Sequence, residues 1–201
     1  MSKSQKTVAF LRHGETELNR DGDRFCGTLD PRLAETGRMQ AARAAAILRD
    51  VIPQIDEAWT SPLERARETA KIILCSADWK IREDLRELSF GQWEGLTKEQ
   101  CRIATPDAFS AWSLDGYTNG PPGGESGQQA KKRVDTVLKA LAESQASTIL
   151  LVSHKTFLRL LVGTILGITP AAIRGSLEIL PARLGILEVK GSKGTLRALN
   201  L

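Results

Sequence analysis

Short apolar runs alternate with amphipathic stretches along this chain. Two of the runs, Thr7 to Leu11 and Thr148 to Val152, are rich in apolar and β-branched residues, a pattern typical of strands that are buried on both faces of a sheet. Residues 35–50 are rich in alanine, with apolar residues at helical spacing. They therefore predict a long amphipathic helix.

The remaining elements follow from the same patterns and from turn and capping residues. They are a strand at Ile55–Thr60, a helix capped by Ser61 with Pro62 at its first position and running to about Leu74, an extended piece at Lys80–Arg82, helices at Thr97–Ile103 and from Ser126 to about Glu143, a helix at Phe157–Leu166, a short helix starting at Thr169 and Pro170, and strands at Leu184–Val189 and Thr195–Leu199. Strands alternating with helices predict an α/β fold: a three-layer α/β/α sandwich with a largely parallel central sheet.

Two polar, turn-rich segments interrupt this pattern. Residues 21–32 predict a loop folded over the end of the first strand, and residues 95–125 resemble an insertion with its own short helix and a run of glycines and prolines. Long loops of this kind in a compact domain are usually functional. We expect one domain over residues 1–201, with the insertion at about 95–125.

The overall composition fits that single domain. Hydrophobic residues make up 41% of the chain and charged residues 26%, as in ordinary globular proteins. No apolar segment is long enough for a signal peptide or a membrane span, so we expect a soluble, cytoplasmic protein with no membrane partner. The three cysteines show no metal-binding spacing, which favours reduced thiols over disulfides or a zinc site.

The charge of the chain bears on its partners. The net charge is +4, and a basic surface can attract any polyanion. The basic residues are nevertheless scattered, apart from the run Lys131 to Arg133, and few aromatic residues are present for base stacking. We expect no nucleic-acid partner, and a small anionic substrate fits better.

The two histidines of the chain carry the strongest chemical signal. His13 and His154 each follow one of the two buried apolar runs. Because ligands bind beyond the carboxyl ends of strands in open α/β sheets, the two rings could converge there. A neutral imidazole serves as nucleophile, proton carrier or ligand near neutral pH. The alternative for each ring is a structural one, capping a strand or satisfying a carbonyl.

A site made of Arg12, His13, Arg65, Glu87 and His154 would suit phosphoryl transfer. The guanidinium groups match a tetrahedral oxyanion and stay charged. An imidazole can attack phosphorus and form a phosphohistidine, and a buried carboxyl group kept protonated near the substrate can protonate the leaving alcohol. Such a reaction needs neither metal nor cofactor, and the glycine-rich nucleotide motifs are absent.

Five motifs occur in an order that resembles the histidine phosphatase superfamily with its phosphoglycerate-mutase-like fold: LRHGETELN, TSPLERARETA, LRELSFGQWEG, PPGGES and VSHKTFLRLL. The resemblance covers nearly the whole chain and implies a function for several matching residues: His13 as the phosphorylated nucleophile, Glu87 as the proton donor, Arg12 and Arg65 as the phosphate clamp, His154 as the second phosphate-binding imidazole and Asn19 as a hydrogen-bond partner of the phosphoryl group.

Some positions depart from the family pattern. Cys26 and Gly27 stand where many members have Gln-Gly, and Lys155 follows the second histidine where small residues are common. We assign Gly27 and Lys155 to substrate binding, with a solvent-facing helix start as an equal alternative for Lys155. Glu94 is interpreted as a surface residue, and Trp112 as either a wall of the substrate site or an anchor of its loop.

The segments FGQWEG and PPGGES resemble those of α-ribazole phosphatases, and the insertion is shorter than in mutases of the family. The sequence thus predicts a metal-independent phosphomonoesterase that hydrolyses a small phosphorylated metabolite through a phosphohistidine, with specificity set by the insertion. The alternatives are a phosphoglycerate mutase-type phosphotransferase and a noncatalytic phospho-ligand binder on the same fold. The patterns do not choose among α-ribazole phosphate, phosphoserine and sugar phosphates, and a homodimer is a further expectation.

Overall fold

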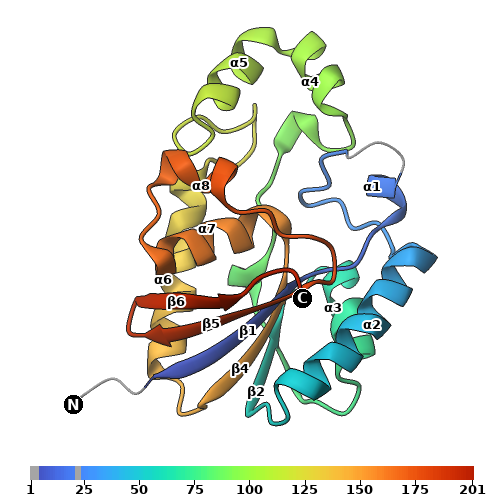
Figure 1. The fold of residues 1–201 in the computed structure, drawn as a ribbon. Coiled ribbons are helices and arrows are strands. Elements are labelled where there is room, and N and C mark those ends of the chain that lie inside the picture. The colour runs from blue at the N-terminus through green and yellow to red at the C-terminus, as the bar shows by residue number, and fades with distance from the viewer. Residues whose placement is uncertain (1–4, 21–23) are drawn as a thin grey trace.

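A mixed six-stranded sheet with helices on both faces forms the centre of the protein (Figure 1). The computed structural model describes residues 5–20 and 24–201. The strand order is β3-β2-β4-β1-β5-β6. The strands are β1 (Lys6–Arg12), β2 (Glu57–Thr60), β3 (Trp79–Ile81), β4 (Thr148–Ser153), β5 (Leu184–Lys190) and β6 (Lys193–Ala198).

Four of these strands are parallel. β1 pairs with β4 in parallel register from Thr7 opposite Thr148 to Arg12 opposite Ser153, and β2 is parallel to both β3 and β4. β5 and β6 join as antiparallel strands on the other side of β1. The predicted largely parallel sheet is confirmed. As a result, the residues after β1, β4 and β2 reach the same edge.

Helices cover both faces of the sheet in three layers. α2 (Glu35–Val51) and α3 (Glu64–Ile73) lie on one face, and α6 (Gly127–Glu143) and α7 (Lys155–Leu166) on the other (Figure 1). The further helices are α1 (Glu17–Arg20), α4 (Lys98–Ala104), α5 (Pro106–Leu114), α8 (Pro170–Ser176) and the 3₁₀ turns at Glu83–Leu85 and Gly91–Trp93.

The apolar run of β1 supplies both cores. Val8 and Phe10 pack in the cluster that includes α6 and α7, whereas Ala9 and Leu11 pack in the cluster that includes α2 and α3. Alternate residues of a strand point to opposite faces, so a strand buried on both sides must be apolar at every position. This burial fixes the register that brings the end of β1 to the functional edge.

The start of α3 differs from the prediction. The helix begins at Glu64 and its N-cap is Leu63, not Ser61 with Pro62 in the first turn. The carboxylate of Asp30 accepts hydrogen bonds from the backbone N–H of Glu64 (2.6 Å) and Arg65 (3.4 Å). A side chain from a distant loop thus satisfies the orphan N–H groups that the prediction gave to Ser61. The predicted cap of α6 is confirmed, because Ser126 and Gln129 form a capping box.

The insertion contains α4 and α5, which extend away from the sheet at the top of Figure 1. They enclose a separate apolar cluster of Phe90, Trp93, Cys101 and Trp112. α5 is not foreseen by the sequence analysis. Of the predicted loop at 21–32, residues 24–32 form no helix or strand and the remainder lies outside the described residues.

Two further expectations bear on the fold. Cys26, Cys75 and Cys101 carry free thiols. Within residues 5–20 and 24–201, no single helix is long and apolar enough to cross a membrane.

Candidate active site

A cavity of about 460 Å³ opens at the carboxyl edge of the parallel strands, beneath the α4–α5 insertion. The residues predicted for the site that line it are Arg12, His13, Asn19, Gly27, Arg65, Glu87 and Lys155. His154 does not belong to this lining and lies behind it, with its ring centroid 5.1 Å from that of His13. The fold therefore brings together the side chains that the sequence analysis singled out from distant segments.

His13 is held as a neutral imidazole with one nitrogen directed at the site. Its Nδ1 lies 2.7 Å from the carbonyl oxygen of Gly14, and because a carbonyl only accepts, Nδ1 carries the proton. Nε2 keeps its lone pair and accepts a hydrogen bond from Nε of Arg65 at 3.3 Å. Burial, followed by the charges of Arg65 and Arg12, lowers the pKa of His13 well below its ordinary value. The ring is therefore a nucleophile at neutral pH.

The glycine after His13 is required by close packing. A Cβ on Gly14 would lie 2.5 Å from the carbonyl oxygen of Gly37 in α2, too close for any L side chain. The Gly14 N–H also donates to Oγ1 of Thr69 in α3 (3.1 Å). The carbonyl that orients His13 is thus fixed between two helices.

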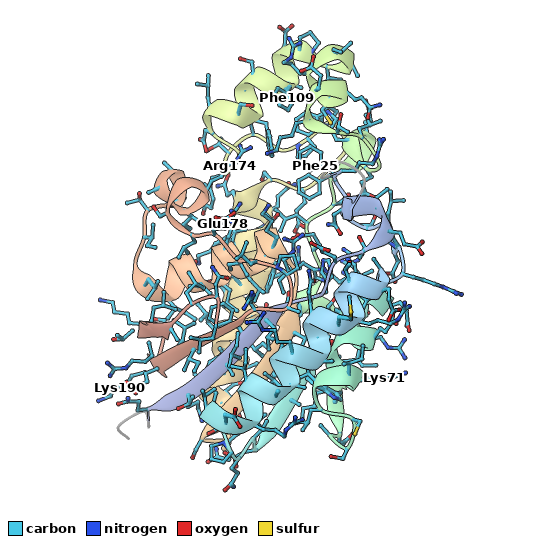
Figure 2. All side chains as sticks on the ribbon, turned by 45° about the vertical axis from the view of Figure 1, so that its right-hand side comes forward. Phe25, Lys71, Phe109, Arg174, Glu178 and Lys190 are labelled. Atoms are coloured by element: carbon cyan, nitrogen blue, oxygen red, sulfur yellow. The ribbon has the colours of Figure 1, made fainter. Side chains whose placement is uncertain are left out.

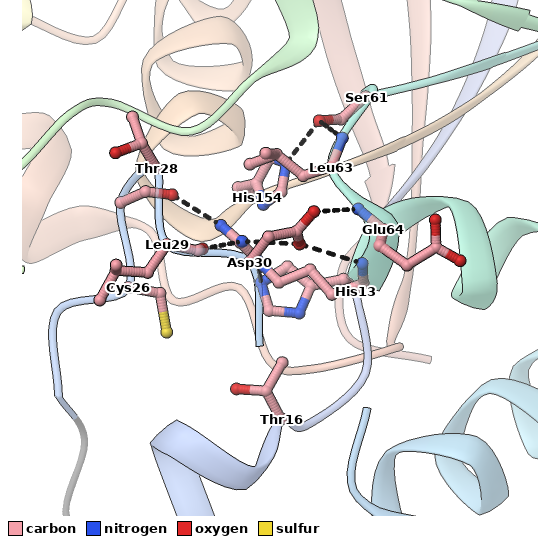
Figure 3. A network of polar contacts seen from close by, with 12 residues as sticks. His13, Thr16, Cys26, Thr28, Leu29, Asp30, Ser61, Leu63, Glu64 and His154 are labelled. Carbon is pink, nitrogen blue, oxygen red and sulfur yellow. Dashed lines mark hydrogen bonds and ion pairs between the residues drawn. The ribbon is translucent and has the colours of Figure 1, made fainter. Parts of the chain in front are cut away.

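His154 is fully buried at the N-cap of α7. Its Nε2 lies 2.7 Å from Oγ of Ser61 (Figure 3), and its Nδ1 is buried with no hydrogen-bond partner among the described residues. Burial first, then the charges of Arg65 and His13, lower the pKa of His154 well below its ordinary value. A buried polar atom without a partner is uncommon in proteins, and a phosphoryl oxygen beside His13 would supply the missing acceptor.

The guanidinium of Arg65 is positioned by the loop after α1. Nη2 donates to the carbonyl of Gly27 (2.9 Å), and Nη1 donates to the carbonyl of Leu29 (2.6 Å) and contacts Oδ1 of Asp30 (3.4 Å). Arg65 has no exposed surface. With these donors engaged, the remaining contact of the guanidinium is that of Nε with Nε2 of His13 (3.3 Å). Asp30, which both caps α3 and contacts Arg65, was missed by the sequence analysis.

Glu94, interpreted as a surface residue, is partly exposed, and its carboxylate is also engaged in several hydrogen bonds. Its carboxylate accepts hydrogen bonds from N and Oγ1 of Thr28 (2.9 and 2.6 Å), N of Leu29 (3.2 Å), Oγ of Ser89 (3.3 Å) and N of Phe90 (3.0 Å). These contacts join the loop that holds Arg65 to the segment after Glu87.

Gly27 is needed for this join. It has φ of +49°, and a Cβ there would lie 2.2 Å from a carboxylate oxygen of Glu94. Left-handed φ favours glycine, and the close approach of Glu94 leaves no room for a side chain. Besides lining the cavity, Gly27 thus contributes its carbonyl group to the positioning of Arg65.

Glu87 is oriented by backbone donors. Its carboxylate oxygens accept from the N–H groups of Leu88, Thr156 and Phe157, each at 3.0 Å. The last two belong to the first turn of α7, where N–H groups lack partners within the helix. These contacts hold the carboxyl group in the cavity wall.

The other predicted residues fit the same pocket. Oδ1 of Asn19 accepts a hydrogen bond from the N–H of Thr16 (2.8 Å), so its amide nitrogen is the donor that a ligand can use. Arg12 is only 7% exposed at the end of β1. Lys155 is half-buried and lines the cavity. Trp112 combines both predicted alternatives, because it lines the cavity and packs in the aromatic cluster of the insertion.

The described part of the chain holds no cluster of three or more histidine, cysteine or acidic side chains suited to a metal ion. What the cavity offers is a neutral imidazole nucleophile, two guanidinium groups and a carboxyl group, a combination suited to the transfer of a phosphoryl group. The family model described as the histidine phosphatase superfamily (branch 1) matches residues 8–201. The chain belongs to this superfamily.

Comparisons with other members extend over nearly the whole chain. Adenosylcobalamin/alpha-ribazole phosphatase of Salmonella typhimurium is 32% identical over 194 residues, which cover 95% of this chain and 94% of the relative. A 2,3-bisphosphoglycerate-dependent phosphoglycerate mutase of Methylorubrum populi is 33% identical, with coverage of 87% and 85%. The structure of a mycobacterial glucosyl-3-phosphoglycerate phosphatase complexed with VO₃ superposes with a TM-score of 0.86 at 29% identity, covering 97% of this chain and 98% of that one. The fold is that of this superfamily, and phosphatases are among its relatives.

Proposed function

We propose that the protein is a metal-independent phosphomonoesterase that hydrolyses a small phosphorylated metabolite through a phosphohistidine on His13. The hydrogen bond from Nδ1 of His13 to the Gly14 carbonyl (2.7 Å) carries the proposal. It leaves Nε2 as the basic nitrogen of a buried neutral ring. The positive charge that develops on the ring during attack is stabilised by the same carbonyl.

In the first step, Nε2 of His13 attacks the phosphorus atom. The N–P bond forms, the bond from phosphorus to the alcohol oxygen breaks, and the protonated carboxyl group of Glu87 gives its proton to that oxygen. Arg12 and Arg65 supply positive charge and N–H donors for the phosphoryl oxygens, and neutral His154 supplies a further N–H donor, which stabilises the transition state.

In the second step, water replaces the alcohol. Its oxygen attacks phosphorus, one of its protons passes to the carboxylate of Glu87, and the P–N bond breaks. Orthophosphate leaves, and both His13 and Glu87 return to their starting states. No electron acceptor, metal or cofactor is required by this balance.

The names of two relatives support hydrolysis, since they are an alpha-ribazole phosphatase and a glucosyl-3-phosphoglycerate phosphatase. The mutase relative supports the alternative in which the phosphohistidine transfers its phosphoryl group to a second hydroxyl. Both reactions share the first step. Action in the cytoplasm and pairing as a homodimer stay predictions.

The proposal is tested by measuring orthophosphate release from α-ribazole phosphate, phosphoserine, sugar phosphates and 3-phosphoglycerate in the presence of EDTA. Release by the wild-type protein, its loss in His13→Ala, and trapping of an acid-labile, alkali-stable phosphoenzyme are expected. Interconversion of phosphoglycerates without release would establish the mutase. Binding of phosphorylated compounds with neither reaction would establish the noncatalytic binder. Activity that disappears with EDTA and returns with a metal ion would contradict metal independence.

A further inference from the structure

The cavity extends well beyond the residues that handle the phosphoryl group. Its outer walls come from α5, the segment 115–117, the outer turns of α7 and the start of α8. A volume of about 460 Å³ is in the range of sites for whole small molecules. The part of the substrate that carries the phosphate therefore lies against these walls.

The acidic residues that the described part of the chain contributes to the lining already have partners. Glu87 accepts three backbone N–H groups, and Glu125 is paired with Arg133 at 2.6 Å. Oδ1 of Asp115 accepts the N–H groups of Tyr117 (3.0 Å) and Thr118 (3.2 Å) in the turn after α5. These contacts use the carboxylates within the protein.

Three basic residues of the cavity lining come from α7 and α8. Lys155 and Arg159 both line the cavity and lie four residues apart on α7, which places them on one face of the helix, about 6 Å apart along its axis. Arg174 of α8 also lines the cavity. α8 packs against α7, and burial, followed by the positive charge of Arg159, lowers the pKa of Arg174.

Arg174 is held in place without a carboxylate. Its guanidinium carbon lies 3.7 Å from the ring centroid of Trp112, and Nη1 donates to the Trp112 carbonyl at 3.3 Å. Among the described residues, no carboxylate lies within ion-pair distance of Arg174 (see its position below α5 in Figure 2). A guanidinium stacked on an aromatic ring keeps in-plane donors for an anionic group.

We infer that Arg159 and Arg174 form a second anion subsite, so that the preferred substrate is a phosphomonoester whose alcohol portion carries a further carboxylate or phosphate. This inference rests on the proposed function for its reaction, but the subsite itself is a property of binding. The phosphate end lies between His13, Arg12 and Arg65, and the second anion lies at the junction of α7 and α8.

Binding is measured first, by calorimetry with compounds that cannot be hydrolysed. Alkylphosphonates of increasing chain length are compared with ω-carboxyalkylphosphonates and alkane bisphosphonates of the same lengths. One length with a second anion is expected to bind the wild-type protein about tenfold to a hundredfold more tightly than its uncharged counterpart, since charge-assisted hydrogen bonds contribute this much. The two anionic series distinguish a carboxylate from a phosphate.

Variants then test which residues cause the preference for compounds with a second anion. Arg174→Gln and Arg159→Gln are each expected to reduce the affinity ratio between the anionic and uncharged compounds about tenfold, whereas Arg174→Lys keeps part of it because a cation is retained. Arg102→Gln is the matched control for loss of one positive charge, because Arg102 is exposed on α4, pairs with Glu99 and is absent from the cavity lining. The affinity ratio between anionic and uncharged compounds should be the same for Arg102→Gln and the wild type.

An equal affinity for anionic and uncharged compounds at every length would overturn the subsite, as would a preference that survives both glutamine variants. Turnover of the corresponding phosphate esters is a separate readout. If anionic phosphonates are preferred but no ester is hydrolysed, the subsite stands and the proposed phosphatase activity fails. If esters are hydrolysed without any preference for a second anion, the proposed phosphatase activity stands and the subsite fails.

Discussion

Oγ of Ser61 lies 2.7 Å from Nε2 of His154 and also accepts the backbone N–H of Leu63 at 3.3 Å. The Ser61 hydroxyl can also donate, and it donates to Nε2 when the proton of the neutral His154 ring resides on Nδ1. In this tautomer, the buried Nδ1–H is a donor for a phosphoryl oxygen.

Removal of this hydroxyl should weaken catalysis. In Ser61→Ala the Nε2 acceptor loses its donor, a change that costs about 1–3 kcal/mol for a buried group, so kcat/KM should fall about tenfold to a hundredfold. Steady-state kinetics with the best ester of the substrate panel measures the effect. Ser153→Ala is the matched control, because the Ser153 hydroxyl is equally buried but donates to the Leu85 carbonyl (2.7 Å). A similar loss in both variants would show that Ser61 acts only through stability.

Substitution of Glu87 should affect substrates according to their leaving groups. Glu87→Gln keeps an acceptor oxygen for the α7 N–H groups but cannot give up a proton, so hydrolysis of alkyl phosphates should slow by about 10²–10⁴-fold. Aryl phosphates, whose leaving groups need little protonation, should lose less in the first step. Parallel kcat/KM measurements on both substrate classes test this. Equal losses would argue against Glu87 as the acid.

The stability of the protein should decrease in mildly acidic solution. The pKa values of His13 and His154 lie well below the ordinary value in the folded protein, mainly because of burial, whereas unfolded histidines titrate at about 6.5. Between these values the unfolded chain binds more protons, so the free energy of unfolding falls as the pH drops below about 6.5, by at most about 1.4 kcal/mol per pH unit for each ring.

Denaturant unfolding at a series of pH values on both sides of the ordinary histidine pKa measures this slope. His154→Gln removes one titrating ring and should flatten the curve relative to the wild type. A slope that is the same in wild type and variant would mean that the folded protein does not hold His154 neutral.

Disruption of the Glu94 contacts should alter phosphate binding at a distance. Glu94→Gln replaces one acceptor oxygen with an amide NH₂, which faces either the N–H groups of Thr28 and Phe90 or the Thr28 hydroxyl and the Leu29 N–H. This should cost about 1–3 kcal/mol of stability. Because the same loop holds Arg65, the Kd for orthophosphate or vanadate should rise as well. Glu99→Gln on α4 is the control, since Glu99 contacts only exposed Arg102. Lower stability with unchanged Kd would contradict a link between this loop and Arg65.

The sheet and its flanking helices were predictable because burial on both faces leaves a clear mark on sequence. β1 and β4 are continuously apolar, and α6 starts with a capping box that can be identified locally. The sequence of α5 shows no such pattern. Its apolar side chains pack within the separate cluster of the insertion, so neither sheet core determines their spacing.

The site was predictable where a reactive side chain directly follows a buried strand. His13 and His154 follow buried strands, and the motifs around them resemble a known family. Asp30 and Glu94 were not recognised, because their partners lie 34 and 66 positions away in the chain and a carboxylate that satisfies backbone N–H groups has no local signature. The mistaken cap at Ser61 has the same origin, since the side chain that satisfies α3 comes from a loop far away in sequence.

The aromatic cluster of the insertion has a consequence for how this protein can be altered. Phe90, Trp93, Cys101 and Trp112 bury one another without depending on either sheet core, while His13 and His154 are anchored to the strands. The cavity wall formed by α5 is thus supported separately from the strands that carry the two histidines. Replacing residues 95–125 with a different segment on the same strands should therefore change which esters enter the cavity, while His13 and His154 keep their positions.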